Sequence, residues 1–156
     1  MKIKKAFGML LVLVLATMVL ISADKAYKTV ADLLTDARST VKEITVEEAY
    51  DLYRKKASDI VFLDVREAEE VEAGHIPGAT WIPRGLIEFK IEKMFPDRNA
   101  QVFVVYCKSG GRSLLAAKTL QEMGYEVMSV KGGFTAWKTK RFPIRRGLPS
   151  TSGGGC

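Results

Sequence analysis

The sequence predicts an α/β domain in which helices cover both faces of a mostly parallel sheet. Two short runs, residues 60–63 and 102–106, are continuously apolar, which is typical of strands buried on both faces. Helical patterns alternate with the strands, and such alternation indicates βαβ units with parallel neighbours. The chain has 156 residues, of which 47% are hydrophobic. That size is sufficient for one domain with its own core.

Two helices are expected before the first buried run. Apolar residues recur at helical spacing from Tyr27 to Ala37, which predicts an amphipathic helix over 25–38. Thr45 and Glu48 have the spacing of a capping box, in which each side chain binds the other residue's backbone N–H. We therefore expect a second helix to begin here and to end near Lys56.

The remaining elements continue the alternation. In order they are a helix over 67–73 ended by Gly74, a strand over 79–83, a helix over 86–94 ended by Pro96, a helix after residues 107–112 that Gly124 caps, a strand over 126–130 and a helix over 132–140.

The N-terminus has the pattern of a secretory signal. Lys2, Lys4 and Lys5 precede an uncharged apolar stretch over 6–23, and Ala23 ends an acceptable cleavage site. The stretch is also close to the length of about 17–25 residues that spans a membrane, so an uncleaved anchor is the alternative. With either a cleaved signal or an uncleaved anchor, the rest of the chain is expected to be exported. This predicts a bacterial periplasmic domain, either free or anchored in the inner membrane.

The expected organisation is a signal peptide or anchor (1–23), an amphipathic helical segment (24–40), the α/β domain (41–147) and a flexible tail (148–156). The net charge of +6 includes the three lysines of residues 1–23, so the exported part carries only +3. A charge that small does not favour nucleic-acid binding.

One histidine and two distant cysteines, Cys107 and Cys156, do not favour a Cys/His zinc site, and no metal is predicted.

The segment after the second buried strand has the composition of an anion site. Ligands of parallel sheets bind at the carboxyl ends of strands, where Cys107 stands. Two glycines let backbone N–H groups turn inward, the following helix adds its positive N-terminus, and two cations flank them. We expect a cup with Cys107 at its floor, in which the positive field favours the thiolate. The residues of the cup are Lys108, Ser109, Gly110, Gly111, Arg112 and Ser113.

Four segments together resemble the rhodanese sulfurtransferases. They are LDVRE at 63–67, GHIPGA at 74–79, CKSGGRS at 107–113 and GGFTAW at 132–137, in the family's order, and the resemblance covers roughly residues 41–147. It implies a five-stranded parallel sheet between helices. Export of a single domain is similar to the small periplasmic rhodaneses of bacteria.

The resemblance also implies the chemistry. The Cys107 thiolate would attack the outer sulfur of thiosulfate or a similar small sulfur oxyanion, sulfite would leave, and a persulfide would remain on Cys107. Cyanide or a reduced thiol, which a redox protein can supply, would then take the sulfur. Arg112 is the expected clamp for the donor and Lys108 a second charge. No metal or organic cofactor is implied.

Two other functions stay open. The first is a sulfur-carrier or partner-binding module that another protein loads and that does not turn over free thiosulfate. The second is a cysteine-dependent phosphatase or arsenate reductase. Those enzymes place five residues between cysteine and arginine, whereas four separate Cys107 from Arg112, and the tighter loop favours sulfur over a tetrahedral phosphate.

Several other residues have structural interpretations. His75 is expected to hydrogen-bond the backbone of its turn, Asp64 and Arg66 to pair with each other, and Phe134 and Trp137 to lie in the core. The basic residues after Glu126 are either a solvated face or an attraction for anions. Cys156 has no assigned role, although a disulfide with Cys107 or with a second chain is the alternative.

Overall fold

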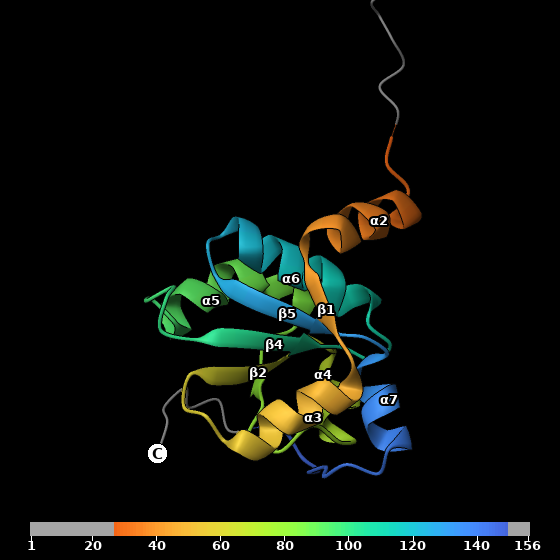
Figure 1. The fold of residues 1–156 in the computed structure, drawn as a ribbon, viewed down its shortest axis with the longest axis vertical. Helices are drawn as coiled ribbons and strands as arrows, with labels where there is room; N and C mark the ends of the chain where they lie inside the picture. Colours follow the sequence, from red (N-terminus) through yellow and green to blue (C-terminus); the bar gives the residue numbers. More distant parts are fainter. Residues whose placement is uncertain (1–26, 150–156) are drawn as a thin grey trace, which may run out of the picture.

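A five-stranded parallel sheet forms the centre of the computed structural model, which describes residues 27–149 (Figure 1). Its strands are β1 (Lys42–Ile44), β2 (Ile60–Asp64), β3 (Thr80–Trp81), β4 (Val102–Tyr106) and β5 (Glu126–Val130). Their order is β1-β5-β4-β2-β3, and every pair is parallel. The prediction of a parallel α/β sheet is therefore confirmed. Residues 1–23 and Cys156 lie outside the described residues.

Helices cover both faces of this sheet. They are α2 (Val30–Thr40), α3 (Val46–Lys55), α4 (Ala68–Glu72), α5 (Ile87–Met94), which the 3-10 turn η1 (Arg84–Leu86) precedes, α6 (Gly111–Glu122) and α7 (Gly133–Thr139). In Figure 1, α2, α5 and α6 lie on one side of the sheet, and α3 and α7 lie on the other. Two separate apolar clusters match these two sides. Within residues 27–149, no helix has the length and apolar character that a membrane crossing requires.

The capping box at Thr45 is present as predicted. The Thr45 hydroxyl accepts a hydrogen bond from Glu48 N–H (3.2 Å), and the Glu48 carboxylate accepts one from Thr45 N–H (2.7 Å). A second box that the sequence analysis missed, formed by Thr29 and Asp32, begins α2. The helix expected over 25–38 is α2, over Val30–Thr40, and residues 27–29 before it are not helical.

Two strands differ from the expectation. β1 was not predicted, since only three residues form it and it is paired along one edge with β5. The strand expected over 79–83 contains only Thr80–Trp81. Beyond Trp81 the chain makes one more bond to β2, from Ile82 N–H to the Asp64 carbonyl (3.0 Å), and then reaches Pro83, which has no N–H to donate.

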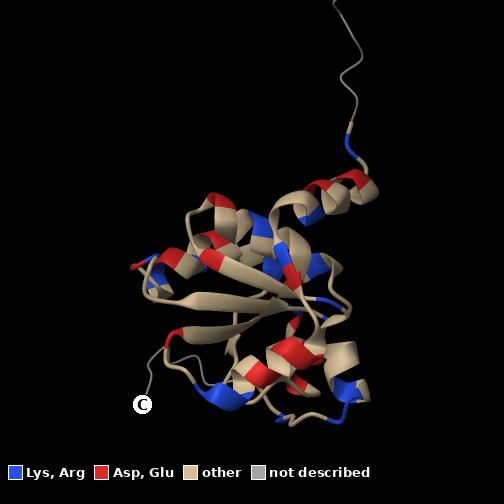
Figure 2. Ribbon diagram, viewed as in Figure 1, with Lys and Arg blue, Asp and Glu red and all other residues tan. Residues whose placement is uncertain are grey.

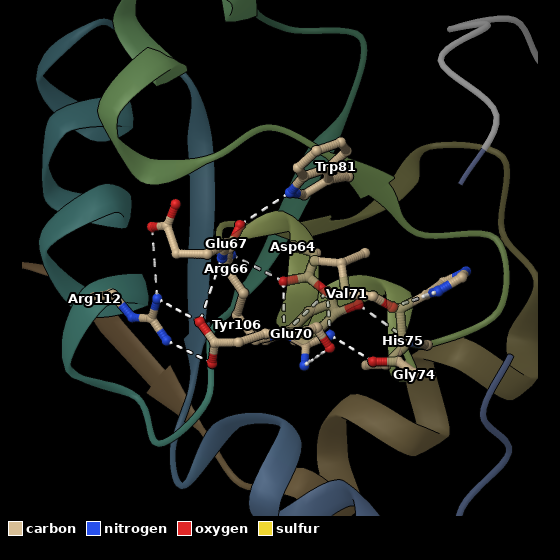
Figure 3. Close-up of polar contacts among 11 residues, drawn as sticks. Asp64, Arg66, Glu67, Glu70, Val71, Gly74, His75, Trp81, Tyr106 and Arg112 are labelled. Atoms are coloured by element: carbon tan, nitrogen blue, oxygen red, sulfur yellow. Dashed lines mark hydrogen bonds and ion pairs between the residues drawn. The ribbon is translucent and has the colours of Figure 1, made fainter. Parts of the chain in front are cut away.

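A buried ion pair joins the end of β2 to α4 (Figure 3). Arg66 donates from Nε and Nη2 to the Asp64 carboxylate (2.9 and 2.6 Å), and both side chains are almost fully buried. Its guanidinium also donates to the carbonyl oxygens of Glu70 (3.0 Å) and Gly74 (2.8 Å). Burial acts against its charge, but the bonds to Asp64 outweigh that effect, so the pKa of Arg66 is raised. The expected Asp64–Arg66 pairing is thus confirmed, and Arg66 binds the backbone in the middle of α4 and just after its end.

Replacing Asp64 with alanine should destabilise the fold strongly, because it leaves a buried guanidinium without its counter-charge. We expect a loss of about 3–5 kcal/mol in the free energy of unfolding, measured by urea denaturation. Glu47→Ala is the control, since Glu47 and Lys140 form an exposed pair that solvent screens, and its loss should be much smaller. Equal losses in the two variants would contradict the role of the buried pair.

Candidate active site

Cys107 lies directly after β4 at the carboxyl edge of the sheet, and only 1% of it is exposed. The backbone N–H of Gly110 donates to its sulfur at 3.2 Å. Gly110 has φ +108°, a left-handed conformation that glycine adopts without strain. A Cβ there would also lie 3.3 Å from the backbone nitrogen of Gly132. The glycine therefore permits the turn that brings an amide onto the sulfur.

The start of α7 holds the first part of the loop from the other side. Phe134 N–H donates to the Cys107 carbonyl (2.7 Å), and Thr135 N–H donates to the Lys108 carbonyl (2.9 Å). Gly133, with φ +54°, lies so close that a Cβ would be 2.4 Å from the Cys107 carbonyl oxygen. The sequence analysis included this glycine only in the resemblance. Its position within a Gly-Gly pair before a helix was the available signal.

Two buried serines complete the support of the loop. Ser113 donates to the Gly110 carbonyl (3.0 Å), and Ser129 of β5 donates to the Ser113 hydroxyl (3.1 Å). Lys108 and Ser109 are exposed at the rim, and Gly111 begins α6. Of the predicted loop residues, Gly110 contacts the Cys107 sulfur directly, and Ser113 supports it by binding the Gly110 carbonyl. Ser129 was missed, because a lone serine in a strand gives no signal of this contact.

Arg112 is engaged by carboxylates of the acidic helix α4 (Figure 3). Its Nη1 and Nη2 contact the two carboxylate oxygens of Glu70 at 2.8 and 2.9 Å, and Glu67 lies 3.8 Å away. Hydrogen bonding to Arg112 lowers the pKa of Glu70. The Arg112 pKa is raised, first by Glu70 and also by the negative charge of a Cys107 thiolate. Sequence reasoning placed Glu70 only within the helix expected over 67–73 and missed this role.

The other candidate residues have structural partners. His75 is buried, its backbone pairs with Arg145, and its Nδ1 lies 3.4 Å from the Val71 carbonyl oxygen. Phe134 and Trp137 lie in the core as expected. Figure 2 shows lysine and arginine residues along α7 and the segment after it, where Lys140 pairs with Glu47. Within residues 27–149, no group of three or more potential ligands could hold a metal ion.

The site can therefore stabilise a negatively charged sulfur. Its cysteine is buried at the end of a central strand, a backbone amide points at the sulfur, and the following helix begins at the same loop. Such oriented N–H groups stabilise an anion without reorganising.

Comparison with known proteins identifies relatives for most of the domain. A family model described as a rhodanese-like domain matches residues 45–140. A sulfurtransferase of Allochromatium vinosum is 36% identical over 87 residues, which cover 55% of this chain and 78% of that protein. The thiosulfate sulfurtransferase GlpE of Pseudoalteromonas translucida is 37% identical over 99 residues, which cover 62% and 89%.

A solved structure from Rhodopseudomonas palustris is similar in fold and sequence. It superposes with a TM-score of 0.72 at 36% identity and covers 78% of this chain and 98% of its own. That protein is of unknown function and is described as a possible tyrosine phosphatase.

Replacing Gly133 with alanine should displace the loop, because the new Cβ would overlap the Cys107 carbonyl. We expect a loss of about 3 kcal/mol or more in the free energy of unfolding. Gly85→Ala is the matched control, since a Cβ at Gly85 meets no atom within 4 Å and its φ is not in the left-handed range. A Gly133 variant as stable as the Gly85 variant would show that the close contact is not required.

The Glu70–Arg112 pair should make stability depend on pH. Because Arg112 lowers the pKa of Glu70, the pair stabilises the folded state above the ordinary carboxyl value of 4.5 and is lost as the pH falls through the lowered pKa. Glu70→Gln should reduce the unfolding free energy by about 0.5–1 kcal/mol at neutral pH, since solvent screens this partly exposed pair. The difference should shrink as the pH falls below the lowered pKa of Glu70. A difference independent of pH, measured by urea unfolding, would contradict the pairing.

Proposed function

The chain belongs to the rhodanese-like family of sulfurtransferases, and on that premise we propose that it transfers sulfane sulfur from thiosulfate or a similar donor through a persulfide on Cys107. A thiophilic acceptor, either cyanide or a thiol, takes the sulfur in the second half of the cycle. The observation that carries the proposal is the hydrogen bond from Gly110 N–H to the Cys107 sulfur, within a loop that α7 holds in place.

The first step is attack by the Cys107 thiolate on the outer sulfur of thiosulfate. A new S–S bond forms, the S–S bond of thiosulfate breaks, and sulfite leaves with the bonding electron pair. The persulfide anion that remains carries one negative charge, as the thiolate did. In the second step the acceptor attacks the outer sulfur, and the Cys107 thiolate leaves.

The loop supplies what these steps need. The Gly110 amide already contacts sulfur, and the N-terminus of α6 follows it directly. Both favour negative charge on the cysteine or on its persulfide. Arg112 stands in the first turn of α6, where its guanidinium can bind the oxygens of a sulfonate group in the manner of other Arg–oxyanion contacts.

Phosphatase activity is the second candidate, because of the similar Rhodopseudomonas palustris protein. Four residues rather than five separate Cys107 from Arg112, and this tighter loop disfavours a tetrahedral phosphate. Hydrolysis of p-nitrophenyl phosphate that Cys107→Ser abolishes would favour this alternative over sulfur transfer.

We also propose that the domain acts in the bacterial periplasm. The support is the basic and apolar pattern of residues 1–23, which is typical of an export signal. Fractionation of cells that express the full chain, with detection in periplasmic, membrane and cytosolic fractions, distinguishes cleavage, anchoring and failure of export.

Thiosulfate should add one sulfur atom to the protein. We expect the intact mass of the reduced chain to increase by that amount, and cyanide to restore the original mass. Cys107→Ala should show no increase. Sulfur gain from a persulfidated donor protein but not from thiosulfate would instead support the carrier module, and no gain from either donor would reject sulfur transfer.

A further inference from the structure

The side chain expected to clamp an anionic donor already binds a carboxylate. Both terminal nitrogens of Arg112 are engaged by Glu70, at 2.8 and 2.9 Å, in the two-pronged arrangement that carboxylates and sulfonates share. A sulfonate that uses the same fork has to displace Glu70. Glu67, at 3.8 Å, adds a second negative charge beside the guanidinium.

The position of Glu70 is set by contacts to Arg66 and Glu67. Arg66, itself paired with Asp64, donates to the carbonyl oxygen of Glu70 and so fixes the backbone of that residue. The Glu70 carboxylate also accepts from Glu67 N–H (3.3 Å), as part of the capping box of α4. Moving the Glu70 carboxylate away from Arg112 therefore breaks its contacts with both the guanidinium and Glu67 N–H. The carboxylate consequently competes with any other anion for the Arg112 guanidinium.

Charge acts differently on different sulfur donors. Thiosulfate is a dianion whose sulfonate needs Arg112, and near the α4 carboxylates it experiences repulsion. An organic persulfide, R–S–SH, needs only the loop amides at its outer sulfur. Its reaction balances without a sulfonate: the Cys107 thiolate attacks the outer sulfur, the S–S bond of the donor breaks, Cys107–S–SH forms, and the thiolate R–S⁻ leaves with the bonding electron pair.

We propose that Glu70 is a specificity-determining residue, which competes with the donor's oxyanion group for Arg112 and so favours persulfide donors over thiosulfate. This inference rests on the proposed sulfurtransferase function and names the donor class that the site prefers. Glu70→Gln keeps the size of the side chain and the backbone carbonyl that Arg66 binds, but it removes the competing charge.

The test compares two donors in Glu70→Gln. The kcat/KM with thiosulfate should rise about five- to tenfold, whereas that with glutathione persulfide should change less than about twofold. Glu72→Gln is the matched control, because it removes the same charge from an exposed position of α4 that makes no side-chain contact with Arg112. Equal changes for both donors, or the same change in Glu72→Gln, would overturn the proposal.

A binding measurement separates this inference from the proposed function. Titration of thiosulfate into Cys107→Ala, where no transfer can occur, should give about five- to tenfold weaker binding than into the variant that also carries Glu70→Gln or Glu70→Ala. The two Glu70 substitutions guard against a folding defect in one of them. Equal or undetectable binding in all three variants would overturn the inference. Failure of wild-type Cys107 to gain sulfur from either donor would instead reject the proposed function.

Discussion

The close approach of Gly133 to the backbone of Cys107 and Lys108 is the constraint on which the site depends. It lets two N–H groups at the start of α7 bind the carbonyl oxygens of these residues. Cys107 thereby stays at the end of β4 with its carbonyl held, and the chain turns at Gly110, whose N–H meets the sulfur. Any side chain at position 133 would separate α7 from the loop. The close packing of the α7 backbone against the loop backbone therefore keeps the Cys107 sulfur in contact with the Gly110 N–H.

A second line of contacts starts from the buried Asp64–Arg66 pair. Arg66 binds the carbonyl oxygens of Glu70, within α4, and of Gly74, just after it. The Glu70 carboxylate in turn binds Arg112 in the first turn of α6. The loop is therefore fixed by two contacts. The start of α7 binds its first residues, and Glu70 of α4 binds Arg112 at its end. The contact with α7 determines where the Cys107 sulfur lies, and the contact with Glu70 determines whether the Arg112 guanidinium can bind another anion. Sulfur chemistry and donor choice are in this way separate properties of the structure.

Local patterns were enough to predict most of the fold and the centre of the site. The buried runs that became β2 and β4, the Thr45 capping box and the loop after Cys107 are each contained in a few consecutive residues. The missed features depend on distant contacts. β1 is three residues paired only with β5, Glu70 meets a side chain 42 residues away, and Ser129 acts through Ser113. The sequence shows whether each of these residues is polar or apolar, but the residues that they contact are determined by how the elements pack in the fold.

Sulfur transfer by this protein requires the loop after β4 to hold sulfane sulfur on Cys107. A crystal structure of the reduced protein after treatment with a sulfur donor tests it most directly. We expect one additional sulfur atom bonded to the Cys107 sulfur, within hydrogen-bonding distance of loop N–H groups, with the Phe134 and Thr135 contacts unchanged. An unmodified cysteine would contradict the account, and so would a persulfide that points away from the amides or requires the loop to leave α7.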